Sequence, residues 1–127
     1  MSRHFLFATF FCFFVLQPRI LLASEEIELS APNDIALVRP LSAAIDAVGK
    51  AVTECLKAGG DPQQCQCDNL DSIALFNKET AKLLAERPQW KDAMLLVRNF
   101  GSGGESLSLS MAGVIKQSQH DYSYCPK

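Results

Sequence analysis

The chain has 127 residues, a formal net charge of −2 and five cysteines. This length suits a single small domain. The 12 basic side chains form no long run, which argues against the basic surface of a nucleic-acid-binding protein, so no nucleic-acid partner is expected.

The N-terminus has the pattern of a secretory signal peptide. After Arg3, an apolar run with Thr9 as its one polar residue covers residues 5–16 and ends before Pro18. The run is too short to cross a membrane, which needs roughly 20 residues. We therefore predict a signal peptide over residues 1–24, cleavage within 23–25, and no stable membrane span afterwards. The alternative is a retained N-terminal anchor. Cleavage would place the mature protein in the periplasm or the extracellular space.

Removal of the signal leaves 10 basic and 14 acidic residues, a net charge of −4, because Arg3 and Arg19 are lost and no acidic residue is. Four cysteines remain, and an even count in a small exported domain predicts two disulfides. The four are Cys55, Cys65, Cys67 and Cys125. A bond between positions 65 and 67 would be strained. The pairing 55–65 with 67–125 is preferred, and 55–67 with 65–125 stays open, since loop entropy does not separate them.

A first amphipathic helix is predicted from Pro40, which suits the first helical position, to the glycine cap at Gly59. Its apolar residues recur at helical spacing, with Val48 in the middle of the expected buried stripe. The stripe is Leu41, Ala44, Ile45, Val48, Val52, Cys55 and Leu56. Residues 36–39 fit either a short strand or an extra helical turn. Residues 25–39 are expected to form an N-terminal extended segment, and 40–127 a single domain.

A second amphipathic helix is predicted over residues 69–86, ended by Pro88. Its expected stripe is Leu70, Ile73, Phe76, Ala81 and Leu84, widened by Leu83. The segment between the two helices contains two glycines and a proline, so a turn is expected there.

The C-terminal third has strand character. Residues 93–100 are compactly apolar, residues 105–111 alternate between serine and larger apolar side chains, and glycines lie between them. A β-hairpin with one wet serine face is predicted. Residues 112–119 suggest a short helix. The expected fold class is α+β: two amphipathic helices, a β-hairpin and a disulfide-tethered C-terminal tail.

The closely spaced Cys65 and Cys67 also fit other chemistry. Zinc sites commonly use C-x2–4-C pairs matched by a second pair, and only His120 is left to complete a set. A redox centre typically has C-x-x-C at a helix N-terminus, one residue longer than this spacing. Structural disulfides are favoured, and no metal or cofactor is expected.

A catalytic set is not recognisable in the sequence. His120 and Asp121 are adjacent without a serine motif, and residues 101–106 lack both a nucleophile elbow and the lysine of a phosphate-binding loop. Trp90 and the tyrosines of `DYSYC` are expected in core packing and tail docking, with a ligand surface as the alternative.

The expected function is therefore that of a small exported, non-catalytic binding or interaction module, not an enzyme. Its partner would be an unknown protein or envelope component. The alternative is a thiol–disulfide or metal-handling protein that acts through Cys65 and Cys67.

Overall fold

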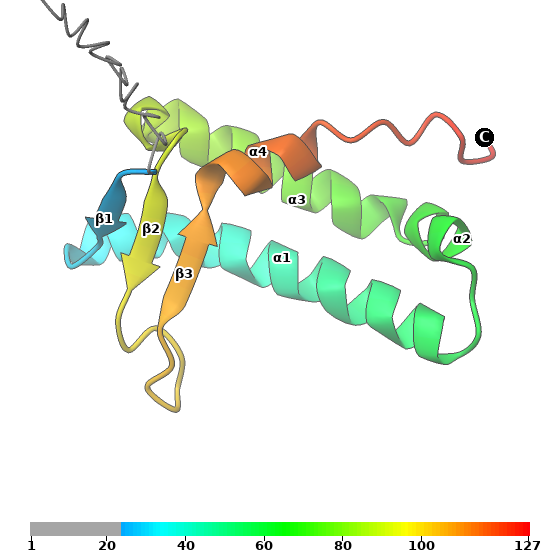
Figure 1. The fold of residues 1–127 in the computed structure, drawn as a ribbon, viewed down its shortest axis with the longest axis horizontal. Coiled ribbons are helices and arrows are strands. Elements are labelled where there is room, and N and C mark those ends of the chain that lie inside the picture. Colours follow the sequence, from blue (N-terminus) through cyan, green and yellow to red (C-terminus); the bar gives the residue numbers. More distant parts are fainter. Residues whose placement is uncertain (1–23) are drawn as a thin grey trace, which may run out of the picture.

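The computed structural model describes residues 24–127, so the predicted signal peptide lies outside the described residues except for Ser24. Helices combine with a small sheet in the predicted α+β class (Figure 1). In chain order the elements are β1 (Glu26–Glu28), α1 (Pro32–Lys57), α2 (Pro62–Cys67), α3 (Leu70–Glu86), the 3-10 turn η1 (Pro88–Trp90), β2 (Met94–Val97), β3 (Leu107–Ser110) and α4 (Met111–Ser118).

Helix α1 begins eight residues before the predicted start, so the expectation of an extended segment over 25–39 is wrong for 32–39. Pro32 lies in the first turn, where backbone N–H groups have no partner within the helix, so the missing N–H of proline costs no hydrogen bond. Asp34 places a negative charge near the positive end of the helix dipole. Pro40 lies inside the helix on an exposed position. In the sequence, Pro40 is typical of a helix start because proline is common at the first helical position.

The connection between α1 and α3 contains the predicted glycine turn and an unpredicted short helix. Gly59 has φ +88° and ends α1 in the left-handed region, as expected. Asp61 then caps α2 by accepting hydrogen bonds from the backbone N–H groups of Gln63 (3.1 Å) and Gln64 (3.3 Å). The sequence of α2, PQQCQC, has no apolar periodicity. The Asp61-Pro62 pair is its only feature that is typical of a helix start.

Helix α3 has the predicted extent, but its buried face is rotated from the predicted one. The buried residues are Ile73, Phe76, Thr80 and Leu83, whereas Ala81 is exposed. Thr80 can be buried because its hydroxyl donates to the carbonyl of Phe76 at 2.9 Å. Thr80, whose hydroxyl is bonded within its own helix, is therefore buried at the place where hydropathy predicts its neighbour Ala81.

The sheet has the order β1-β2-β3. Strands β2 and β3 form the predicted antiparallel hairpin, with Leu95 opposite Leu109. Strand β1 was not predicted, and it pairs in parallel with β2. Met111 begins α4 and is not the last strand residue, because the Ser110 side chain accepts from the backbone N–H of Gly113 and caps the helix.

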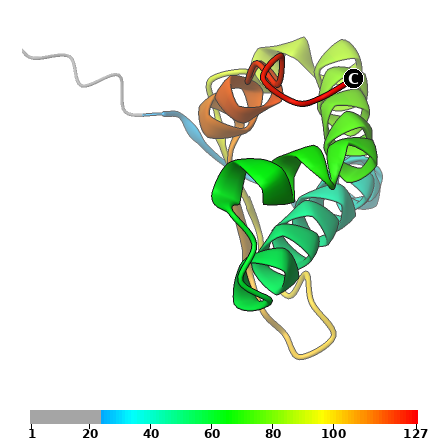
Figure 2. The same ribbon diagram turned by 90° about the vertical axis from the view of Figure 1, so that its right-hand side faces the viewer.

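One core joins the sheet to the helices. Its most deeply buried large side chains come from α1, α3, the strands and the start of α4: Leu41, Leu83, Leu95, Met111, Val38 and Val97. Helices α1 and α3 pack along each other, while α4 lies over α3 (Figures 1 and 2). The sheet covers only one end of this helical layer (Figure 1). At the other end lie α2 and the C-terminal tail.

Candidate functional site

Two disulfides lie at the end of the molecule farthest from the sheet. Cys55 of α1 bonds Cys65 of α2, with 5.6 Å between their Cα atoms. Cys67, at the end of α2, bonds Cys125 across 58 positions of sequence, with a Cα separation of 5.4 Å. This is the pairing that the sequence favoured.

The same geometry bears on the alternative chemistry of the cysteine cluster. Cys65 and Cys67 each bond a different distant cysteine, and the Cys65 side chain is fully buried. Within residues 24–127, no group of three or more His, Cys, Asp or Glu side chains is placed to hold a metal ion. His120, the candidate fourth ligand, instead packs edge-on against Tyr122, with 4.6 Å between ring centroids.

The C-terminal tail, residues 119–127, runs from α4 back to α2 (Figure 1). The Tyr124 hydroxyl donates to the side-chain oxygen of Gln66, and partial desolvation raises the pKa of Tyr124. Asp121 accepts hydrogen bonds from the backbone N–H (2.9 Å) and the hydroxyl (3.0 Å) of Ser123, which lower the pKa of Asp121. The disulfide and the Tyr124–Gln66 hydrogen bond hold the tail against α2, and the Asp121–Ser123 hydrogen bonds order the tail locally.

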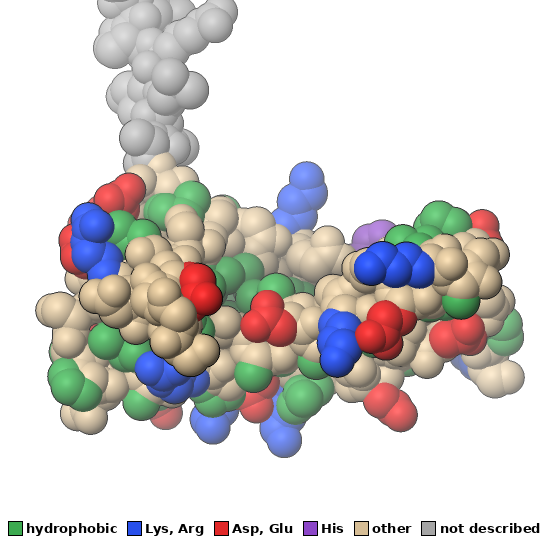
Figure 3. Space-filling view, turned by 90° about the horizontal axis from the view of Figure 1, so that it is seen from below, with side chains coloured by type: hydrophobic (Ala, Val, Ile, Leu, Met, Phe, Trp, Pro, Cys, Tyr) green, Lys and Arg blue, Asp and Glu red, His purple; other side chains and the backbone are tan. Residues whose placement is uncertain are grey.

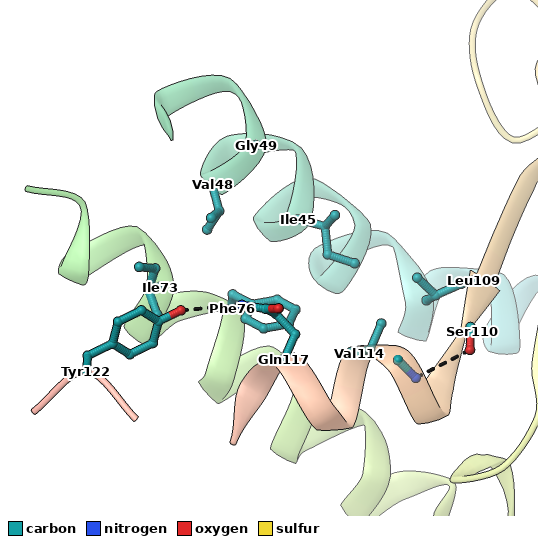
Figure 4. A pocket seen from close by; sticks show the side chains of 11 residues that line it. Ile45, Val48, Gly49, Ile73, Phe76, Leu109, Ser110, Val114, Gln117 and Tyr122 are labelled. Atoms are coloured by element: carbon teal, nitrogen blue, oxygen red, sulfur yellow. Dashed lines mark hydrogen bonds between the residues drawn. The ribbon is translucent and has the colours of Figure 1, made fainter. Parts of the chain in front are cut away.

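An apolar cleft lies between α1 and α4, and α3 forms its floor (Figure 4). Its volume is about 430 Å³. Leu109 lies at one end and Tyr122 of the tail at the other. The lining consists of Ile45, Val48, Gly49, Ile73, Phe76, Leu109, Ser110, Gly113, Val114, Gln117 and Tyr122.

The cleft corrects the prediction that the whole apolar stripe of α1 is core. Leu41 and Ala44 are buried, but Ile45 and Val48 are only partly buried and line the cleft. Further along, Leu56 is 42% exposed. The first half of the stripe packs under the sheet, and the second half extends beyond it, where no strand covers it.

Two glycines line the cleft within helices. A methyl group at Gly49 of α1 would meet no atom within 4 Å, and one at Gly113 of α4 would meet only the Ser110 side chain, at 3.5 Å or more. Glycine inside a helix costs about 1 kcal/mol relative to alanine. Close packing therefore requires neither glycine.

The polar groups of the cleft gather near its Tyr122 end. The side-chain amide of Gln117 lies 3.5 Å from the Tyr122 hydroxyl as a hydrogen-bond donor (Figure 4). Ser110, toward the other end, is engaged as the cap of α4. Among the described residues that line the cleft, none is Asp, Glu, Lys, Arg or His. The site can therefore bury apolar surface and offer neutral hydrogen bonds.

The other residues noted in the sequence lie outside the cleft. Trp90 is buried in the core beneath Arg87, whose guanidinium carbon is 5.6 Å from the ring centroid. The glycines after Phe100 form the hairpin loop, where Gly104 has φ +81°. Charged side chains of both signs are interspersed with hydrophobic ones on the face shown in Figure 3. Sequence reasoning missed the cleft, although the two helix-interior glycines were a signal.

Comparison of the chain with protein-family models, with curated proteins and with solved structures gives no match. No helix within residues 24–127 combines the length and the apolar character needed to cross a membrane.

Proposed function

We propose that this protein is an exported, non-catalytic binding module and that the cleft between α1 and α4 is its binding site. The observation that carries the proposal is the open apolar space of about 430 Å³. Small-molecule sites commonly measure about 300–1,000 Å³ and are lined mainly by apolar side chains with a few polar groups.

Stability considerations support a functional origin for this space. Filling an open apolar cleft would bury Ile45 and Val48 further, and burial of apolar area contributes about 25 cal/mol per Å². Alanine in place of Gly49 would also favour the helix. The cleft thus lacks two available sources of stability, further apolar burial and a better helix former, and this is expected of a binding surface.

The assignment as non-catalytic rests on the chemistry of the lining. Acid–base and nucleophilic catalysis commonly use His, Asp, Glu, Lys or Cys close to the reacting atoms. The described residues that line the cleft include none of these, and His120, which packs against Tyr122, is outside the lining. The nearby Asp121 carboxylate is already engaged by Ser123.

Export is supported by two independent features. The disulfides indicate an oxidising compartment. The N-terminal residues have the composition of a signal peptide, as argued above. No observation favours the thiol–disulfide or metal-handling alternative, because Cys65 is buried and bonded to Cys55.

The test is binding of N-phenyl-1-naphthylamine, an uncharged dye that becomes fluorescent in apolar sites. The wild-type protein is expected to bind the dye saturably, with one site per chain. Gly49→Trp should occupy the cleft and abolish the signal, because Gly49 lines the cleft and a Cβ atom at this position meets no atom within 4 Å.

The matched control is Ala47→Trp, two positions away and exposed outside the lining of the cleft. It should leave dye binding unchanged. Equal binding by wild type and Gly49→Trp, or no saturable binding by wild type, would contradict the proposal. Thermal denaturation of both variants would verify that they are folded.

A further inference from the structure

We propose that the ligand of the cleft is a small uncharged molecule with an apolar body and an oxygen-bearing head group, and that Gln117 and Tyr122 bind this head group. The inference rests on the function proposed above. It adds the chemical class of the ligand and its direction in the site.

The size of the cleft favours a small molecule over a protein segment. The wall formed by α4 runs from Ser110 to Gln117, and a rise of about 1.5 Å per residue makes it about 10 Å long. A specific protein interface usually buries about 800 Å² on each partner, far more than this cleft offers.

The lining selects against a net charge within the cleft. An ionic group that enters the cleft loses part of its hydration, and this costs free energy unless an opposite charge or hydrogen bonds replace the lost water. The lining side chains supply apolar carbon over most of the cleft, from Ile45, Phe76 and Val114 among others. An ammonium or carboxylate head would find no counter-charge among them.

The polar end provides both kinds of neutral hydrogen bond. When the Gln117 amide donates one N–H to Tyr122, its second N–H and its carbonyl oxygen remain unused by this bond. The Tyr122 hydroxyl can also donate its own proton. A hydroxyl or an amide on the ligand can therefore donate to Gln117 and accept from Tyr122, and an ester can accept from either residue.

The apolar end fixes the direction of binding. Leu109 lies at the end of the cleft remote from Tyr122 (Figure 4), and it is largely buried against the core. Ser110 beside it is committed to the helix cap. The ligand is therefore expected to enter with its apolar end toward Leu109 and to leave its oxygen at Gln117.

Competition of three compounds with ten-carbon chains against N-phenyl-1-naphthylamine tests the inference: 1-decanol below its solubility limit, and decanoate and decyltrimethylammonium below their critical micelle concentrations. Decanol should displace the dye at concentrations at least about tenfold lower than either ion, since a desolvation cost of only about 1.4 kcal/mol for the ionic head group produces a tenfold difference. Equal displacement by all three would overturn the inference and leave the cleft as a site. No displacement by any of them would overturn the inference as well, while dye binding itself would still report on the proposed function.

A charge placed at the head-group end gives a second, independent readout. Gln117→Arg should reverse the preference, so that decanoate displaces the dye better than decanol does, because the new guanidinium pairs with the carboxylate. Gln119→Arg adds the same charge to an exposed position outside the cleft and should leave the wild-type order unchanged. An identical effect of the two variants would show that Gln117 does not contact the head group.

Discussion

Cys67 and Cys125 join the end of α2 to the C-terminal tail, and the same tail places Tyr122 at one end of the cleft. Only two residues separate Tyr122 from the disulfide, and the Cys125 backbone N–H donates to the Tyr122 carbonyl at 2.9 Å. The disulfide therefore contributes to the stability of the domain and to the shape of the cleft.

Cys125→Ser is expected to weaken both. The disulfide closes a loop across 58 positions, which the chain-entropy relation values at about 4 kcal/mol. For a domain of this size about 4–8 °C of melting temperature is lost per kcal/mol, so the melting temperature should fall by well over 10 °C. Dye affinity should fall too, because Tyr122 is no longer held. Thermal circular dichroism and dye titration measure the two effects.

Lys127→Ser, beyond the disulfide, is the control and should change neither property. An unchanged melting temperature in Cys125→Ser would show that the tail is not bridged. A lower melting temperature with unchanged dye affinity at a temperature where the variant is folded would show that the tail does not form part of the site.

Two glycine substitutions should change stability in opposite directions. A methyl group at Gly60 would lie 2.5 Å from the Cys65 sulfur and 2.7 Å from the Cys55 sulfur, so Gly60→Ala should destabilise the protein by about 1–3 kcal/mol. Gly49→Ala meets open space and should stabilise α1 by about 0.5–1 kcal/mol. Urea denaturation at constant pH measures both free energies of unfolding. Destabilisation by Gly49→Ala would mean that the glycine is needed for packing.

The predictions from sequence succeeded where one local pattern dominates. The hairpin follows from alternating residues in 105–111, and the end of α1 follows from Gly59. Exclusion of the strained 65–67 bond reduced the possible disulfide pairings to two. Loop entropy did not distinguish these two, so the choice of 55–65 with 67–125 was only a weak preference. The start of α1 was missed because Pro40 is compatible with a helix start and with an exposed helix interior.

The cleft could not be predicted because it depends on tertiary packing. The apolar stripe of α1 is continuous in sequence from Leu41 to Leu56, and nothing in it marks where the sheet stops covering the helix. The parallel pairing of β1 with β2 is equally non-local, since Ile27 and Leu95 are far apart in sequence. Periodicity identifies a face of a helix but not what lies against it.

Val48→Asp and Leu41→Asp should separate binding from stability. Leu41 is 1% exposed, so a carboxylate there would be buried unpaired and should cost several kcal/mol, about 3 or more. Val48 is partly buried at the cleft, where the new carboxylate can reach water, and the cost should be about 1 kcal/mol. Val48→Asp should nevertheless abolish dye binding. Urea denaturation and dye titration measure the two effects.

Lys50→Asp, exposed and outside the lining, should affect neither property by a measurable amount. Equal destabilisation by Val48→Asp and Leu41→Asp would show that the α1 stripe is core along its whole length, as the sequence alone suggested.

Processing near Ser24 or Glu25 should leave the fold intact. The Glu25 carbonyl accepts a hydrogen bond from the Met94 backbone N–H at 2.8 Å, so β1 needs this residue at its start. Intact-mass measurement on exported protein should give an N-terminus at one of these two positions. A full-length mass in the membrane fraction would favour the retained anchor instead.

The tail should loosen locally at acidic pH through Asp121. Hydrogen bonds from Ser123 lower the pKa of Asp121 in the folded protein. A depressed carboxyl pKa means that the stabilising interaction is fully present above the unfolded value of about 3.9 and is lost as the pH falls through the lower folded value. The amide chemical shift of Ser123, followed by NMR, should therefore titrate with a midpoint below about 3.9. In Asp121→Asn this titration should disappear, because the amide side chain carries no ionisable proton in that range. A midpoint at or above the ordinary carboxyl value would show that Ser123 does not bind the carboxylate, and that the tail at Tyr122 is held by the disulfide and Gln66 without it.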